Sequence, residues 1–182
     1  MKSFPPGAHT DTEHPRFLAH ATPERLRKII VPALGAREYF SSPSNQPQPT
    51  GVHNHILVVD DDAAVRDVLA NFLRHSGYRV NCASDGEAGW EALCANRFDA
   101  LITDHAMPRL TGLDFLRRVR SGPYKVTPAI LISGEMPWEE RDLLDLVRPG
   151  VAMEKPFSML ELLTSVRGVL AMATHAEAVY VG

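Results

Sequence analysis

The sequence predicts a doubly wound α/β domain, in which five helices cover a five-stranded parallel sheet. Two observations predict this fold. Short apolar runs such as ILVV at 56–59 and AILI at 129–132 show no polar alternation, which is typical of parallel strands buried on both faces. Amphipathic helical stretches separate these runs, and strands that alternate with helices are typical of a doubly wound sheet.

Each element has its own signal. The predicted strands are residues 56–59, 79–83, 100–102, 129–132 and 151–153, and the more polar 79–83 suits a sheet edge. The first helix carries apolar residues at helical spacing over 65–73 and ends at Gly77. The next three helices are predicted over 87–95, 113–120 and 137–147. The last begins at the capping box Ser158–Glu161 and runs to about residue 170.

The N-terminal third differs in composition from the rest. Residues 1–53 hold eight of the 14 prolines, and the stretch SSPSNQPQPT at 41–50 is a linker by composition. We expect this Pro/His-rich extension to be mostly disordered, apart from a short helix over 22–30 capped by Thr22. The predicted folded domain is 54–172, followed by a C-terminal tail at 173–182.

Composition excludes several classes of protein. A net charge of −3 and a pI near 6.2 argue against binding to nucleic acid through phosphate contacts. The longest apolar run, 29–36, is far shorter than the roughly 20 residues that span a bilayer, and no secretory signal is visible. Two cysteines form neither a disulfide framework nor a zinc motif. We therefore expect a cytoplasmic protein.

Polar side chains follow the predicted strands where the strands end. Asp60, Asp61 and Asp62 come directly after the first strand, and Asp104 comes after ALIT at 100–103. Ser133 and Lys155 follow the fourth and fifth in the same way. Because ligands of such sheets bind at the carboxyl ends of the strands, these side chains are expected to converge on one site.

The types of residue indicate the chemistry of that site. Clustered carboxylates repel each other unless a cation lies between them, and a hard divalent ion such as Mg²⁺ prefers oxygen ligands. A lysine and a serine beside them supply a positive charge and a hydrogen bond for phosphoryl oxygens. The set therefore suits a phosphoryl group on Asp104, with the metal and Lys155 neutralising charge.

Residues 55–171 resemble the receiver domain of two-component response regulators. The resemblance rests on four motifs in order: ILVVDDD at 56–62, LITDHAMPRLTG at 101–112, ILISGE at 130–135 and EKPF at 154–157. It implies a flavodoxin-like fold with strand order 2-1-3-4-5. It also implies that Asp104 accepts a phosphoryl group from a histidine kinase or a histidine phosphotransfer protein.

The resemblance assigns the remaining site residues. Asp61 and Asp104 would bind Mg²⁺ together with the backbone carbonyl of Ala106, and Asp60 would act through metal-bound water. Ser133 and Lys155 would contact the phosphoryl oxygens. Asp62 has no site role in the family, so we interpret it as a helix N-cap. The Lys155–Pro156 bond is expected to be cis.

The sequence departs from the family pattern at two places. Ala152 stands where receivers usually have Tyr or Phe, so the usual coupling of a hydroxyl shift to rotation of an aromatic ring has lost its ring. Ala106, two residues after the phosphoacceptor, has no side chain that could position a hydrolytic water, although Glu135 could do so. We therefore predict an aspartyl phosphate that is not especially short-lived.

Other reactive residues have structural interpretations. His53 and His55 could chelate a metal, but linker histidines are commoner, and His105 is interpreted as a loop residue beside the site. Cys82 and Cys94 are expected to pack as small apolar groups.

Two aromatic and three basic residues are also interpreted structurally. Trp90 and Phe115 are expected in or beside the core, and a solvated basic helix face is predicted from Arg117, Arg118 and Arg120.

The favoured function is a stand-alone, phosphorylation-controlled switch or a phosphorelay carrier, not an enzyme in the usual sense. Its output would be binding to a downstream protein, without nucleic acid or membrane, and dimer formation stays open. Two alternatives remain. The first is a phosphate-independent interaction module, a pseudo-receiver, which Ala152 favours. The second is a hydrolase or phosphatase, which Ala106 disfavours because that position lacks a second catalytic acid.

Overall fold

The computed structural model describes residues 54–179, with side chains over 54–172. The predicted extension at 1–53, its helix at 22–30 and His53 lie outside the described residues. Within the described part, none of the helices is both long and apolar enough to cross a membrane.

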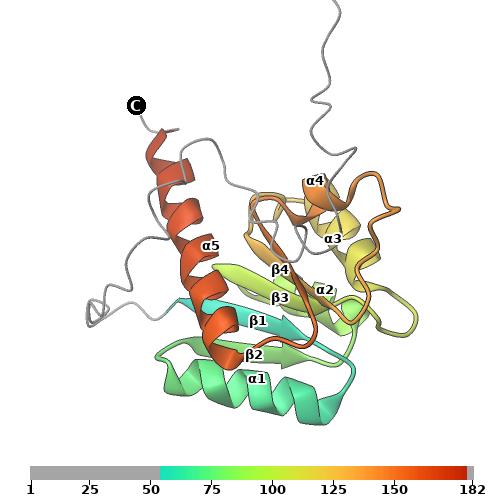
Figure 1. Cartoon of the computed structure of the whole chain (residues 1–182). Helices are drawn as coiled ribbons and strands as arrows, with labels where there is room; N and C mark the ends of the chain where they lie inside the picture. The colour runs from blue at the N-terminus through green and yellow to red at the C-terminus, as the bar shows by residue number, and fades with distance from the viewer. Residues whose placement is uncertain (1–53, 180–182) are drawn as a thin grey trace, which may run out of the picture.

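Five strands and five helices alternate along the chain, as predicted (Figure 1). The strands are β1 His55–Val59, β2 Arg79–Ala83, β3 Ala100–Asp104, β4 Ala129–Ser133 and β5 Gly150–Glu154. The helices are α1 Ala63–His75, α2 Gly86–Ala95, α3 Gly112–Ser121, α4 Leu143–Val147 and α5 Met159–Val179. All neighbouring strands are parallel, in the order β2-β1-β3-β4-β5, which confirms the predicted doubly wound topology.

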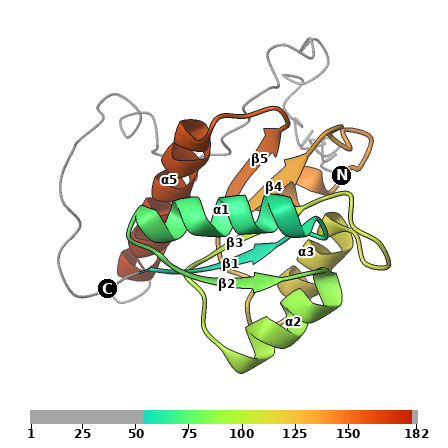
Figure 2. The ribbon, with the colours of Figure 1, turned by 90° about the horizontal axis from the view of Figure 1, so that it is seen from below.

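The sheet separates two hydrophobic cores. Alternate residues of the central strands point to opposite faces, so Leu57 and Leu131 enter one core while Ile56 and Ile130 enter the other. Helices α2, α3 and α4 close the first core, which contains the fully buried Phe115. Helices α1 and α5 close the second, and Figure 2 shows them together on one side of the sheet.

The helix starts follow the predicted capping chemistry. The Asp62 carboxylate accepts hydrogen bonds from the N–H groups of Ala64 and Val65, so the interpretation of Asp62 as N-cap of α1 is confirmed. Ser158 and Glu161 exchange the reciprocal bonds of a capping box before α5. The Lys155–Pro156 bond is cis, as expected, and Arg148–Pro149 is also cis.

Two helices differ from the prediction in length. The helix predicted over 137–147 is wrong in its first half, because α4 comprises only Leu143–Val147 and turns occupy the residues before it. Its N-cap Asp142 makes no capping hydrogen bond, because that carboxylate binds Arg117 instead. Helix α5 continues to Val179, past the boundary set at 172, and that boundary stays a prediction.

The expectation that both cysteines are packed is wrong, since Cys82 and Cys94 are exposed. Cys82 lies on the edge strand β2, where the outward positions meet solvent. Cys94 follows the buried Leu93 on α2 and therefore points away from the core. Trp90 is partly buried against the first core, as expected.

Candidate phosphoacceptor site

The predicted site residues meet at one edge of the sheet. Asp104 and Ser133 are the last residues of β3 and β4, and the register places Asp104 beside Ile132 and Ser133 beside Glu154. The backbone N–H of Lys155 donates to the carbonyl of Ser133 across 2.8 Å, which fixes the lysine at the same edge.

Asp104 is a buried carboxylate with a cationic partner. Its side chain is 5% exposed, and the Lys155 Nζ lies 2.5 Å from Asp104 Oδ1. Within residues 54–172, Lys155 is the hydrogen-bond donor to this carboxylate, which engages one of its two oxygens. The arrangement leaves a carboxylate oxygen for a ligand and a positive charge beside it.

Asp60 lies next to this pair, in surroundings that disfavour the ionised form of its carboxyl group. It is 3% exposed. Burial, together with the negative charges of Asp104 and Asp61, raises the pKa of Asp60 above its usual range, while the hydrogen bond from the Asp62 N–H opposes this shift. The electrostatic coupling places these carboxylates close enough to interact, and Asp61 itself is exposed to solvent.

The donor set suits a divalent cation. Two buried carboxylates and the exposed Asp61 offer only oxygen ligands. Burial, and then the charges of Asp104 and Asp61, raise the pKa of Asp60, so a cation among them would be stabilised. In the described part of the chain, no three His, Cys, Asp or Glu side chains already lie at metal-binding distances. The residues fit Mg²⁺ by chemistry, and Asp60, Asp61 and Asp104 would hold it. Ala106, whose carbonyl was the fourth expected ligand, is exposed in the following loop.

Ser133 is almost fully buried and bonded to the next segment. Its hydroxyl donates to the carbonyl of Glu135 and accepts from the Glu135 N–H at 3.2 Å. The Glu135 side chain, proposed from the sequence to position water, belongs to an exposed residue. The hydroxyl therefore has a bond that it must give up to serve another acceptor, since it carries a single proton.

The loop from β3 to α3 packs tightly against the phosphoacceptor candidate. A Cβ on Gly112 would lie 2.2 Å from the carbonyl oxygen of Asp104, so only glycine lets α3 begin this close. Arg109 has φ 67°, an unusual conformation for a residue with a side chain, and its guanidinium binds Asp85 at 2.5 Å. No spacing rule in the sequence signals the contact between Arg109 and Asp85.

Comparisons with known proteins agree with this geometry. A family model described as "Response regulator receiver domain" matches residues 56–167. The chain belongs to the response regulator receiver family. Its topology and its strand-end residues therefore match the resemblance seen in the sequence, and membership is consistent with two-component signalling.

Individual relatives support the same assignment. The response regulator MprA of Mycolicibacterium vanbaalenii is 37% identical over 119 residues, which is 65% of this chain and 51% of that protein. MprA of Mycobacterium ulcerans is 39% identical, over 63% of this chain and 49% of that protein. This chain thus spans about half the length of the curated relatives it matches.

Solved structures share the fold. The chemotaxis protein CheY4 of Vibrio cholerae has a TM-score of 0.60 and 31% identity, covering 65% of this chain and 99% of that one. A response regulator receiver protein from Pseudomonas putida has a TM-score of 0.60 and 29% identity, covering 65% and 98%.

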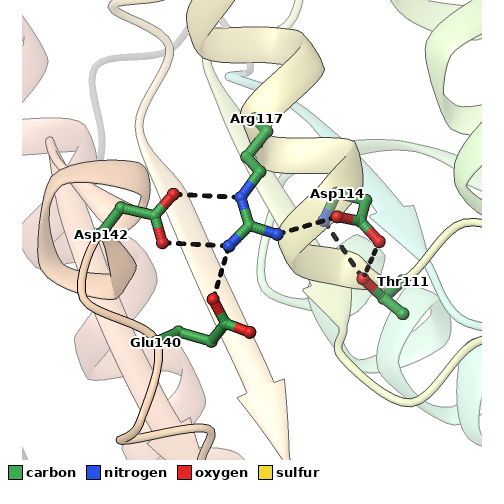
Figure 3. Close-up of polar contacts among 5 residues, drawn as sticks. All are labelled: Thr111, Asp114, Arg117, Glu140 and Asp142. Carbon is green, nitrogen blue, oxygen red and sulfur yellow. Dashed lines mark hydrogen bonds and ion pairs between the residues drawn. The ribbon is translucent and has the colours of Figure 1, made fainter.

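The receiver's α3 arginines, predicted to form a solvated basic face, all have partners, although Arg117 and Arg118 stay 37% and 41% exposed. Arg117 binds three carboxylates at once, those of Asp114, Glu140 and Asp142 (Figure 3). Arg118 pairs with Glu87 and lies 4.5 Å from the centroid of the Trp90 ring. The prediction is wrong for Arg120 and missed the partners of the other two, because charge spacing along one helix does not reveal partners distant in sequence.

Arg120 is the least solvated of the three. Its guanidinium donates to four backbone carbonyls, those of Leu146, Val147, Lys125 and Thr127. Burial lowers the pKa of Arg120 to about 10. This arginine therefore joins the end of α4 to the loop that follows α3.

Two histidines can now be placed. The His55 ring lies within hydrogen-bond distance of two oxygens, since Nδ1 is 3.0 Å from the Arg97 carbonyl and Nε2 is 3.1 Å from Asn81 Oδ1. The chelation alternative also needs His53, which lies outside the described residues, so it stays untested. His105 is partly buried beside the site, and among described residues its buried Nδ1 has no hydrogen-bond partner.

The position of the missing aromatic borders a cavity. A cavity of about 600 Å³ lies between β5 and α5, and its lining includes Ala152 and Lys155. Ala152 is buried, so β5 offers no ring that could move between the core and the surface at this position.

Proposed function

We propose that Asp104 is phosphorylated by a histidine kinase or a histidine phosphotransfer protein, and that the phosphoryl group switches this receiver between two protein-binding states. The observation that carries the proposal is the buried Asp104 carboxylate and its ion pair with Lys155. Asp104 ends β3 and Lys155 follows β5, so both lie at the carboxyl edge of the sheet. A buried carboxylate with one oxygen neutralised and one unengaged is suited to nucleophilic attack.

The transfer follows from the donor's chemistry. A carboxylate oxygen of Asp104 attacks phosphorus, the O–P bond forms, and the P–N bond of the donor's phosphohistidine breaks. The electron pair of that bond leaves with the imidazole nitrogen. A bound Mg²⁺ would supply charge neutralisation for the phosphoryl oxygens. Lys155 would follow the negative charge from the carboxylate to the phosphoryl group, and the Ser133 hydroxyl would turn from Glu135 to donate to it.

The test is direct labelling of the full chain. The protein is incubated with Mg²⁺ and a small phosphodonor such as acetyl phosphate, and acid-stable, hydroxylamine-labile phosphate is measured. We expect one label per chain, which Asp104→Asn and chelation of Mg²⁺ abolish. Asp67→Asn, which changes an exposed carboxylate on α1, is the matched control and should label normally.

The alternatives predict different results. Absence of label in the parent chain would favour a phosphate-independent docking module, the interpretation that Ala152 supports. Release of free phosphate over many turnovers would favour a hydrolase. The domain limits, output through a downstream protein and a stand-alone architecture stay predictions, because the relatives are about twice as long as the matched segment.

A further inference from the structure

The segment of residues 134–142, between β4 and α4, is held at both of its ends. At its start, the Ser133 hydroxyl donates to the carbonyl of Glu135. At its end, Glu140 and Asp142 bind Arg117 on α3. Because Ser133 belongs to the proposed phosphoryl site, one end of this segment contacts that site, and the other end contacts helix α3.

Arg117 makes a polydentate contact. Its Nε and Nη2 each lie 3.0 Å from one oxygen of Asp142, and Nη2 also lies 2.8 Å from Glu140 Oε2. Nη1 lies 2.8 Å from Asp114 on its own helix, and Thr111 orients that carboxylate (Figure 3). A planar guanidinium has several N–H donors in a fixed arrangement and can bind two carboxylates of one segment at once. A lysine ammonium is a point charge and does not fix the geometry of both.

The contact is close to solvent, which allows it to exchange. The Arg117 side chain is 37% exposed and its three partners are 43–46% exposed. Pairs of this kind contribute little stability each, so the contact can open without unfolding the domain. Asp142 makes no capping bond here, and its backbone, at φ −95° and ψ 0°, is not extended. If Arg117 released the carboxylate and the backbone became extended, Asp142 would be able to cap α4, since Asp is a preferred N-cap residue.

We propose that Arg117 is a positioning residue that holds the 134–142 segment in the unphosphorylated arrangement and so couples Ser133 to α4. The proposal rests on the proposed function. When Ser133 turns to a phosphoryl group, Glu135 loses this partner, and of the two polar contacts described above only the one with Arg117 remains, beside the apolar packing of Met136. Release of Asp142 from Arg117 would let α4 reset its start. This route requires no aromatic ring on β5, where Ala152 stands.

The sign of the effect follows from reciprocity. If Arg117 favours the arrangement in which Ser133 is bonded to Glu135, then loss of Arg117 must favour the arrangement that binds a phosphoryl group. Arg117→Gln should therefore bind a phosphoryl mimic more tightly. A residue with only a structural role would weaken binding, or leave it unchanged, when it is lost.

The experiment uses the full chain with Trp90→Phe, which leaves Trp138 as the remaining one of two tryptophans. Trp138 lies in the segment and is 40% exposed. We compare Arg117→Gln, Arg117→Lys and the matched control Arg118→Gln, which changes an arginine of the same helix that pairs elsewhere. Acrylamide quenching of Trp138 reports the segment, and ¹⁹F NMR titration with beryllium fluoride and Mg²⁺ reports affinity for the mimic.

We expect Arg117→Gln to increase quenching of Trp138 before any mimic is added, and to tighten mimic binding by about 5-fold or more. Arg118→Gln should match the parent in both, and Arg117→Lys should lie between. Equal quenching in Arg117→Gln and parent, or weaker mimic binding in Arg117→Gln, would overturn the proposal. Absence of bound ¹⁹F signal in every variant would instead overturn the proposed function, and the quenching comparison would still decide whether Arg117 holds the segment.

Discussion

Replacing Lys155 by Met removes the cation from the buried Asp104 while keeping most of the side-chain volume. Asp104 is 5% exposed and cannot recover the lost interaction from bulk water. Asp60, also buried, adds a second negative charge nearby. The variant therefore leaves two buried carboxylates in one site without their lysine, and we expect it to be less stable than the parent at neutral pH.

The burial of the two partners sets the magnitude. Breaking a fully buried ion pair costs about 3–5 kcal/mol, and exposed pairs contribute about 0–1 kcal/mol. Lys155 is 36% exposed, so this pair lies between the two limits and we expect a loss of about 1–2 kcal/mol. At a urea dependence of about 1–3 kcal/mol per molar, the unfolding midpoint should fall by roughly 1 M.

Urea unfolding followed by circular dichroism measures this difference, with Lys125→Met as the matched control because Lys125 is exposed. Excess Mg²⁺ should stabilise Lys155→Met at least as much as the parent, by about 2.7 kcal/mol at 100 times the dissociation constant. A variant as stable as the parent, with no response to Mg²⁺ in either protein, would refute both the electrostatic account of the site and its use as a cation site.

Three further predictions concern single substitutions. Asp60→Asn should raise the free energy of unfolding by roughly 0.5–2 kcal/mol without Mg²⁺. The pKa of Asp60 is higher in the folded protein than in the unfolded chain, so stability is lost as pH rises and Asp60 becomes charged, and asparagine avoids this loss. Thermal melts with and without Mg²⁺ test this. Gly112→Ala should lower stability by several kcal/mol or displace α3, since its Cβ would overlap the Asp104 carbonyl, and a drop of less than about 0.5 kcal/mol would contradict it. If Asp104 is phosphorylated, Ala106→Asn should shorten the phosphate half-life, and an unchanged decay would count against the role given to Ala106.

A fourth prediction concerns acid stability. Hydrogen bonds from Arg117 lower the pKa of Asp142 in the folded protein. This carboxylate therefore stabilises the fold at pH values above the pKa of Asp in the unfolded chain, which is about 4, and the stabilisation is lost as pH falls through the pKa of the folded state. Asp142→Asn should accordingly flatten the acid limb of the melting temperature against pH. The change should be small because the pair is partly exposed, and parallel curves for variant and parent would contradict the assignment.

The sequence predicts the parallel sheet and its site because both depend on local order. Apolar runs such as 129–132 identify buried strands, and in a doubly wound fold the residue after each strand must lie at the same edge. That rule alone brings Asp104, Ser133 and Lys155 together. The capping roles of Asp62 and Ser158 could also be predicted, because capping bonds are made within three residues of sequence.

The shortened helix depends on contacts between residues that are distant in sequence, and the exposed Cys82 depends on its place at the edge of the sheet. The first half of the helix predicted over 137–147 is absent where Glu140 and Asp142 bind Arg117, more than 20 positions earlier in the sequence. Helical spacing and a proline at the start favoured a longer helix, and tertiary contacts overrode both. Cys82 was misjudged because its average tendency to be buried does not hold for an outward position on an edge strand.

Helices on both faces of the sheet bury apolar residues, but α4 is also held at its two ends by polar contacts, and we expect a response to phosphorylation there. Helix α5 places Leu162, Val166 and Val169 in a fully buried core, and close-packed apolar contacts of this kind do not shift by small steps. Helix α4 is five residues long, and arginines of α3 hold both of its ends through hydrogen bonds. Hydrogen bonds of the partly exposed Arg117, at the start of α4, can exchange partners at low cost, whereas a buried side chain cannot leave its core without opening a cavity. A small change at Ser133 should therefore appear on the face of α3 and α4, and amide exchange measured with and without beryllium fluoride should slow or quicken there while α5 stays constant.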